Sequence, residues 1–255
     1  GVQQNQDMTS IVSDIIVNTN TETGSKIIEE LNNSSTNTEN DLSLKVISAI
    51  SEKDMTKLNT LSENNKEQIE TLTEIAIKNA DASEESADLI AKVVSNASDE
   101  LVNKVVEEVS KNSTDENQAL SAKVMKSIVE TNPDKIETLS DQNKETMISQ
   151  TIEAAKNQAE GTSTDEIDLS NTIAEIVTKS DTATAAEVLE SLEEVSSESE
   201  SKLSLNVVSN LTKQKNYEEK IEILSVTSSE VDKSINNLVE KAVENIASEQ
   251  DLELV

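Results

Sequence analysis

The sequence predicts an all-α protein, an α-solenoid in which three internal repeats of about 80 residues stack short helices side by side. Three observations lead to this prediction. The same sequence blocks return at a nearly constant spacing, and the apolar residues inside each block follow helical spacing. The composition also lacks the aromatic side chains that usually fill a compact core, since the chain has no Phe or Trp and a single Tyr.

The internal repeat is visible at three places along the chain. Residues 41–46 read DLSLKV, residues 119–124 read ALSAKV and residues 202–207 read KLSLNV, so successive copies lie 78 and 83 positions apart. The first of these offsets also aligns KIIEEL at 26–31 with KVVEEV at 104–109. We therefore predict one continuous solenoid made of three repeats, at 5–82, 83–165 and 166–249.

Each repeat is predicted to contain five helices of two to four turns. In the second repeat the apolar residues fall into five bursts of helical spacing, which begin at Leu89, Leu101, Leu120, Ile136 and Met147. Helices this short cannot bury an apolar stripe by themselves, but stacked side by side they share a continuous aliphatic core.

The residues between the bursts favour helix starts. Asn132 precedes Pro133, which suits an N-cap followed by a proline at the first helical position. Ser98, Thr114 and Thr164 each precede two acidic residues, and acids are favourable in the first turn of a helix. With one Pro and three Gly in the whole chain, we expect the links to be Ser/Thr/Asn turns.

Two other structural classes were weighed. The Ser, Thr and Val content is compatible with β-structure, but the period-2 alternation is poor and the Asn-Gly and Asp-Gly hairpin dipeptides are absent. High charge and low hydrophobicity are typical of disorder. A disordered chain has no reason to keep a helical period, however, so the phased aliphatic residues favour helices.

One stretch of the third repeat resembles known helical repeats. Residues 185–196, AAEVLESLEEVS, are similar to the short-helix superhelical repeats of the MgtE magnesium-transporter N-terminal domain and of the flagellar motor-switch protein family. They are also broadly similar to HEAT and armadillo repeats. The resemblance implies an α-solenoid. It does not transfer magnesium binding, because no residue-level motif of that role is present.

Charge excludes several kinds of partner. The chain has 51 acidic residues against 21 basic ones, all of them Lys, for a formal net charge of −30. Phosphate and base recognition depend on Arg and on aromatic stacking, so we expect no nucleic-acid partner. An anionic membrane surface would repel the chain, and no apolar run is long enough to insert into a bilayer.

The residue types needed for catalysis are missing. Without His or Cys, the chain cannot form Ser-His-Asp or Cys-His sites or the usual zinc sites, and it has no glycine-rich phosphate loop. We therefore expect no enzyme and no cofactor. Acidic clusters at Glu84–Glu85, at 165–168 and at 193–200 lack EF-hand spacing, so they predict solvated faces with, at most, weak and diffuse divalent-cation binding. The four Met are predicted to fill the core, and Tyr217 is predicted to open the fourth helix of the third repeat.

The two ends of the chain carry the functional prediction. A free solenoid needs polar terminal faces, yet both terminal segments are as apolar as the middle of the chain. The predicted end-to-end contact residues are Ile11, Ile15, Ile16, Leu238, Val239, Val243 and Ile246. They favour a structural repeat segment of a fibre, filament, surface layer or large adhesin-like protein. Its partner would be itself, either as a homo-polymer or as neighbouring repeats of the same chain.

The alternative is an acidic solenoid that binds basic proteins or peptides. Sparse Lys, no Arg and no Phe or Trp offer proteases few cleavage sites, which favours an extracellular or cell-surface location, outside a bacterial cell. The chain begins at Gly1 and shows no signal peptide, so we expect a processed chain or an excerpt of a longer one.

Overall fold

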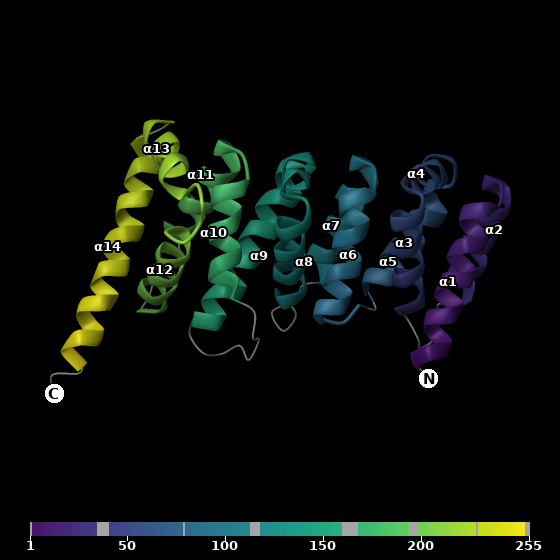
Figure 1. Cartoon of the computed structure of the whole chain (residues 1–255), viewed down its shortest axis with the longest axis horizontal. Coiled ribbons are helices and arrows are strands. Elements are labelled where there is room, and N and C mark those ends of the chain that lie inside the picture. Colours follow the sequence, from purple (N-terminus) through teal and green to yellow (C-terminus); the bar gives the residue numbers. More distant parts are fainter. Residues whose placement is uncertain are drawn as a thin grey trace. The chain divides into compact units, whose positions relative to one another are not determined.

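The computed structural model describes residues 2–34, 41–78, 80–112, 118–159, 168–193, 198–227 and 229–252 (Figure 1). Within these ranges all regular secondary structure is helical, which confirms the predicted all-α class. The helices are α1 (Val2–Asn18), α2 (Thr21–Ser34), α3 (Asp41–Lys53), α4 (Met55–Asn64), α5 (Lys66–Lys78), α6 (Glu84–Asn96), α7 (Asp99–Asn112), α8 (Gln118–Thr131), the 3-10 helix η1 (Pro133–Thr138), α9 (Asp141–Ala159), α10 (Leu169–Lys179), α11 (Thr182–Glu193), α12 (Glu198–Leu211), α13 (Tyr217–Thr227) and α14 (Ser229–Leu252).

Polar side chains cap several helix starts. Asp54, Ser83 and Asp168 precede α4, α6 and α10, and each accepts a hydrogen bond of 2.9–3.1 Å from the backbone N–H three residues further on. The first N–H groups of a helix have no partner inside the helix, so each cap satisfies one of them. These short side chains therefore fix where the helices begin.

The predicted helix starts are confirmed where they are described. Helix α7 begins directly after Ser98, and η1 begins at Pro133. The predicted starts at Thr114 and Thr164 lie outside the described residues. The element at Pro133 is a 3-10 helix of six residues, a form that proteins use in short pieces. Only two residues separate it from α9, so little chain is left for an α-helix there.

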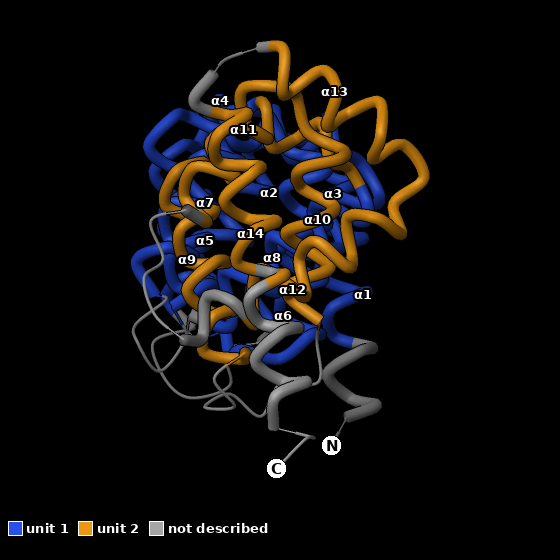
Figure 2. Tube along the Cα trace, turned by 90° about the vertical axis from the view of Figure 1, so that its left-hand side faces the viewer, with its two compact units in different colours: residues 1–131, 138–143 blue, residues 132–137, 144–255 orange. Residues whose placement is uncertain are grey.

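The chain forms two compact units, residues 1–131 with 138–143 and residues 132–137 with 144–255 (Figure 2). In the first unit, α1, α3, α6 and α8 pack in sequence as one row. Helices α2, α5 and α7 pack in sequence as a second row, and α4 packs against α2, α3 and α5. Each helix therefore buries its apolar stripe between neighbours in its own row and in the other row.

The second unit is arranged by similar pairings. Helix α12 packs between α10 and α14. Helix α11 contacts α10, α13 and α14, and α13 also packs against α14. The buried residues of α10 lie on most sides of the helix, and they include Leu169, Ile173, Ala174, Ile176 and Val177.

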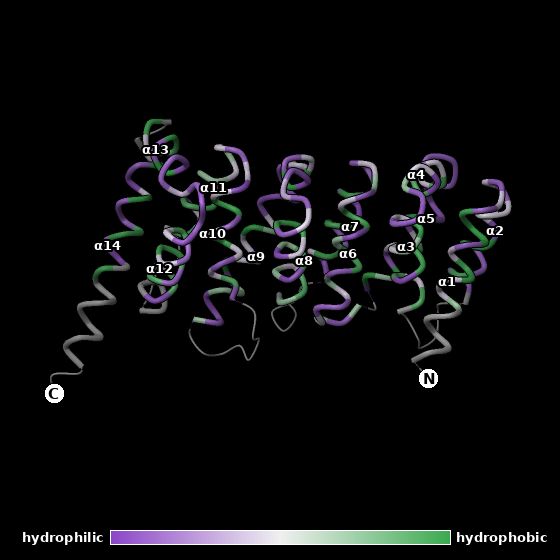
Figure 3. The backbone as a smooth tube through the Cα atoms, in the orientation of Figure 1, coloured by the Kyte–Doolittle hydropathy of each residue, from purple (hydrophilic) through white to green (hydrophobic). Residues whose placement is uncertain are grey.

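The core is almost entirely aliphatic. Side chains such as Ile50, Leu72 and Val106 are fully buried, and burial of each contributes about 1.5–3 kcal/mol. Hydrophobic and hydrophilic positions alternate along the helices with the turn of the backbone (Figure 3). Small residues recur beside the large ones, as in the buried Ser43 and Ser204, which stand at the same place in the repeated LS motif. A small side chain there lets neighbouring helices approach closely.

Candidate functional site

The predicted contact residues of α1 separate into exposed and buried positions. Ile11 is 52% exposed and Ile15 is 45% exposed. Ile16, in contrast, is fully buried, so its assignment as an external contact residue is wrong. The reason is geometric: Ile16 is about 100° around the helix from Ile15. A Cβ added at Gly24 would lie 3.7 Å from the Cγ2 atom of Ile16, which places Ile16 against α2.

The same division holds on α14. Val239 is 44% exposed and Val243 is 58% exposed, and with a spacing of four residues they lie on one face of the helix. Leu238 is buried, so it belongs to the core of its unit and is not a surface contact. The side chain of Ile246 lies outside the described residues.

Sequence reasoning missed four further exposed apolar side chains: Met8, Met55, Ile223 and Val226. The prediction that all four Met fill the core is wrong for Met8 and Met55, although Met125 and Met147 are fully buried. Met8 stands three residues before Ile11 and lies on the same face of α1, so its spacing could have revealed it. Val226, near the end of α13, is 81% exposed, and no comparable spacing marks it.

These exposed residues are concentrated on few helices. Among the described side chains, every exposed large hydrophobic residue lies on α1, α4, α13 or α14. The helices from α5 to α12 have none in their described parts. Single exposed apolar residues are ordinary on protein surfaces, whereas gathered ones mark interaction sites. The apolar faces of α1 and α14 are therefore the candidate functional surfaces.

Within the first unit, comparable apolar helix faces are buried against one another. Helices α3 and α5 meet α6 and α7 there, and a small apolar cavity lies between the four helices. It is lined by Leu44, Ile47, Thr73, Ala76, Ile77, Ile90, Val93 and Val105. All eight side chains are buried, and we call this contact the internal junction.

Polar groups support the rim of the internal junction. Lys92 lies 3.1 Å from Glu52, and Lys45 lies 3.3 Å from Glu85, so two ion pairs join α3 to α6. Both pairs are substantially exposed, and each contributes about 1 kcal/mol or less. The two pairs help to align α3 with α6, because each of them joins residues 40 positions apart in the sequence.

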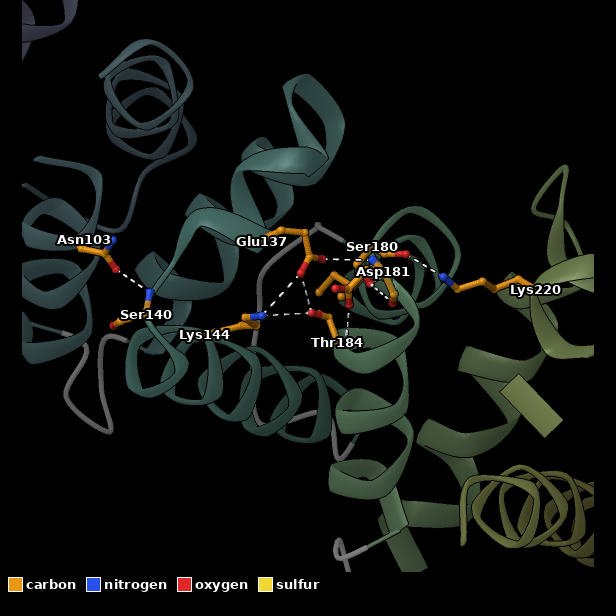
Figure 4. A network of polar contacts seen from close by, with 9 residues as sticks. Asn103, Glu137, Ser140, Lys144, Ser180, Asp181, Thr184 and Lys220 are labelled. Atoms are coloured by element: carbon orange, nitrogen blue, oxygen red, sulfur yellow. Dashed lines mark hydrogen bonds and ion pairs between the residues drawn. The ribbon is translucent and has the colours of Figure 1, made fainter. Parts of the chain in front are cut away.

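A second polar arrangement surrounds Glu137 (Figure 4). Its Oε1 atom accepts a hydrogen bond of 3.0 Å from the backbone N–H of Asp181, and its Oε2 atom accepts one of 3.0 Å from the Thr184 hydroxyl. Lys144 lies 3.4 Å from Oε2. The Glu137 carboxylate therefore binds donors at the start of α11.

The neighbours of this carboxylate have shifted pKa values. Partial burial acts to raise the pKa of Asp181, but hydrogen bonds from Thr184 outweigh it, and the net pKa is lowered. Burial lowers the pKa of Lys220, although Asp181 and Glu137 oppose the shift. Lys220 donates a 2.6 Å hydrogen bond to the Ser180 carbonyl at the end of α10. These groups are satisfied by one another, as expected of a structural network.

The first unit contains a related contact. The Asn59 side chain on α4 accepts a hydrogen bond of 2.8 Å from the backbone N–H of Ser98, directly before α7. Glu137 lies 78 positions after Asn59, and Asp181 lies 83 positions after Ser98. The two contacts therefore occupy matching places in the sequence repeat, and the acceptor changes from an amide to a carboxylate.

The second unit also has a polar hollow, between the end of α9, the start of α10 and the outer face of α12. Lys202, Asn206 and Ser209 of α12 line it, together with Lys213, which lies two residues after the end of α12. Its Asp168 and Asn210 side chains bond to each other at 3.1 Å. The described residues that line the hollow are mainly polar, and none of them is a nucleophile beside a base; a catalytic or small-molecule site usually has an apolar wall and such a pair.

In the part of the chain that the structure describes, no group of three or more acidic side chains could hold a metal ion. Glu84 and Glu85 are described, in the first turn of α6, whereas the predicted acidic clusters near 165 and 194 fall largely outside the described residues. No helix in the described ranges is long and apolar enough to cross a membrane.

No family model, no curated protein and no solved structure matches the chain. The resemblance of residues 185–196 to superhelical repeats therefore stays a prediction. Most of those residues lie on α11, from Thr182 to Glu193.

Proposed function

We propose that the chain is a three-repeat α-solenoid that serves as a structural block, associating end to end with further copies of itself. The observation that carries this proposal is the position of the exposed apolar side chains. Those that are described lie only on α1, α4, α13 and α14, near the two ends of the helix order. A solenoid that functions as a free monomer needs polar terminal faces.

The helix order supports the three-repeat part of the proposal. Helices α2, α7 and α11 begin at Thr21, Asp99 and Thr182, so their starts are offset by the same 78 and 83 positions as the sequence blocks. The pairs α1–α2, α6–α7 and α10–α11 each pack together. Five helical elements recur in the same order, with α4, η1 and α13 in fourth place.

A recurring lysine contact adds to this support. Lys57 donates a 2.5 Å hydrogen bond to the Thr19 carbonyl, just after α1, and Lys220 makes the matching bond to the Ser180 carbonyl after α10. The last carbonyls of a helix have no partner inside the helix, so a lysine there satisfies one of them and complements the helix dipole. Both lysines come from the fourth helix of their repeat.

End-to-end association through two different faces propagates. A contact in which the face of α1 on one copy meets the face of α14 on another is heterologous, and a heterologous contact that does not close gives a filament. Such a block would suit a fibre, a surface layer or a long adhesin-like protein at a bacterial cell surface. We propose no enzymatic activity and no cofactor.

The net charge sets the salt dependence of this assembly. Copies with a charge of −30 repel one another at long range. Added salt screens that repulsion, so self-association should strengthen as ionic strength rises.

The second candidate function is the binding of basic proteins or peptides, which the same charge favours. Attraction between opposite charges weakens with salt, so this function has the opposite salt dependence. Exposed Trp and Arg, which dominate many binding hot spots, are absent from the chain. We therefore rank self-association first.

Sedimentation and negative-stain electron microscopy at micromolar concentration test the proposal. The wild-type chain should form elongated assemblies that grow with salt. Ile15→Glu should abolish them, because it places a charge on the exposed face of α1. Ala183→Glu, at an exposed position on α11, is the control for added charge and should assemble normally. A wild-type chain that stays monomeric at raised salt would refute self-association.

A further inference from the structure

The internal junction provides a template for the contact between copies. It joins the third and fifth helices of one proposed repeat, α3 and α5, to the first and second helices of the next, α6 and α7. Helices α1 and α2 stand first in the described helix order and α12 and α14 stand near its end, so no described helix covers these faces in the way that α6 and α7 cover α3 and α5.

The residues at matching positions stay apolar at both ends. On the N-terminal side, the counterparts of Ile90, Val93 and Val105 are Val12, Ile15 and Ile27. The first and third are half-buried, and Ile15 is exposed, whereas their counterparts in the junction are buried. These three side chains are thus apolar, like their counterparts in the internal junction, but they are not buried by a neighbouring helix pair.

On the C-terminal side, the counterparts of Leu44 and Ile47 are Leu205 and Val208 on α12, and both are half-buried. Helix α14 aligns with α5 through the first described buried residue of each, Val231 and Ile69. Ile77 then corresponds to Val239, which is exposed. Both ends therefore carry matching halves of the junction.

We propose that copies of this chain stack in the register of the internal junction, with α12 and α14 of one copy against α1 and α2 of the next. The inference rests on the proposed self-association and specifies its geometry. The apolar contact consists of Leu205, Val208 and Val239 on one copy and Val12, Ile15 and Ile27 on the other.

A polar pair accompanies the apolar contact. It consists of the Glu222 side chain of one copy and the Asn20 backbone N–H of the next, and we call it the clasp. Asn59 and Glu137 each bind the backbone N–H that precedes the second helix of the following repeat. The matching acceptor in the third repeat is Glu222 on α13, which is exposed and has no polar partner among the described residues. The matching donor in the first repeat is the backbone N–H of Asn20, which forms no hydrogen bond within the described chain. The stack brings these two groups together.

One of the two rim ion pairs fits the same register. Lys213 stands at the position of Glu52, and Asp14 stands at the position of Lys92. The Lys92–Glu52 pair of the internal junction is thus preserved in the stack with its charges exchanged, whereas Asn206 stands at the position of Lys45 and the second pair is not preserved. Asp14 already lies 2.7 Å from Lys53, so Lys213 of the neighbouring copy would become its second cation.

Crosslinking between single-cysteine variants tests the register, since the chain has no cysteine of its own. Val12→Cys and Val208→Cys proteins are mixed and treated with a short thiol-reactive crosslinker. The double variant Ile47→Cys/Ile90→Cys calibrates the reaction, because it places the same pair in the internal junction. A mixture of Val12→Cys with Val226→Cys is the control for a wrong register.

We expect the mixed Val12–Val208 product to form with a yield comparable to the calibrating pair, and to exceed the Val12–Val226 product. If copies associate in sedimentation but crosslink Val12 to Val12 or to Val226, the register is wrong and self-association still stands. If no association occurs, both proposals fail. The three results are therefore distinguishable.

Substitution of Glu222 tests the clasp. Glu222→Ala should weaken association about tenfold, as expected for the loss of one hydrogen bond to a charged group. Glu222→Gln should retain most of the affinity, because an amide oxygen fills the same role at Asn59. Equal association of the wild type and both variants would overturn the clasp.

Discussion

The Glu137 carboxylate and the backbone N–H of Asp181 form a 3.0 Å hydrogen bond between residues 44 positions apart. The same carboxylate also binds the Thr184 hydroxyl, so both of its oxygens face the first turn of α11. A helix N-terminus carries unsatisfied donors and a partial positive charge, and a carboxylate compensates both. Glu137 is therefore placed to couple η1 to α11.

Removing this carboxylate should destabilise the second unit. We expect Glu137→Ala to lower the free energy of unfolding by about 1–3 kcal/mol, since it leaves the donors at the start of α11 without their acceptor. Urea denaturation followed by far-ultraviolet circular dichroism measures the change. Glu190→Ala, an exposed acid on α11, is the matched control. Equal effects of the two substitutions would show that the Glu137 contacts contribute nothing.

Glu108 should make the stability sensitive to acid. It is buried on α7, where Lys104 lies at 2.9 Å and Lys111 at 3.0 Å. Burial acts to raise the pKa of Glu108, but the hydrogen bonds from the two lysines outweigh it, so the pKa is lowered overall. A lowered pKa in the folded state stabilises the fold above the unfolded pKa of about 4.3, and this stabilisation is lost as the pH falls through the folded value.

The measurement compares Glu108→Gln with the wild type. The difference in their free energies of unfolding should be about 1–2 kcal/mol at neutral pH, and it should shrink as the pH falls below the unfolded pKa and through the lowered pKa of the folded wild-type carboxylate. Comparing the two proteins removes the contribution of the other acidic residues. A difference that stays constant with pH would contradict the ionised state of Glu108.

Matched valine substitutions should separate the covered face from the open one. Val93→Ala, in the internal junction, should cost about 2 kcal/mol, because it removes two buried methyl groups and leaves a cavity. Val12→Ala, on the open face of α1, should cost less than about 1 kcal/mol in the dilute monomer. Thermal unfolding at low protein concentration tests this contrast. Similar costs would mean that the face of α1 is already covered within the chain.

Gly24→Ala should stabilise α2. Glycine inside a helix is less favourable than alanine by up to about 1 kcal/mol. An added Cβ would lie 3.4 Å from Leu61 Cδ2 and 3.7 Å from Ile16 Cγ2, which are ordinary contacts with movable side-chain atoms. A rise in the unfolding temperature is expected, and a fall would show that Leu61 has no room to adjust.

The sequence predicted the helices well because their determinants are local. Apolar spacing and capping residues such as Ser98 depend on a few neighbouring positions. Which face of a helix stays open depends on distant neighbours, so Ile15 and Ile16 could not be separated by composition alone. The acceptor role of Glu137 was also missed, since only the fold brings it to Asp181.

Repetition could have improved the prediction of the site. Asn59, Glu137 and Glu222 share one position in the proposed repeat, and Ser98, Asp181 and Asn20 share another. The chain alone could not show that these two positions touch. The two contacts seen in the structure, extended through the proposed repeat, lead to the proposed pairing of Glu222 with Asn20.

The helix that carries Glu222 begins with Tyr217, whose hydroxyl lies 3.5 Å from Glu218. This is the sole aromatic ring of the chain, so all near-ultraviolet absorbance and intrinsic fluorescence arise at one site, five residues from the proposed clasp. Near-ultraviolet absorbance is consequently weak, so peptide absorbance or amino-acid analysis measures the concentration more sensitively. In return, the emission of the unmodified protein is a built-in optical reporter on the C-terminal end of the helix order.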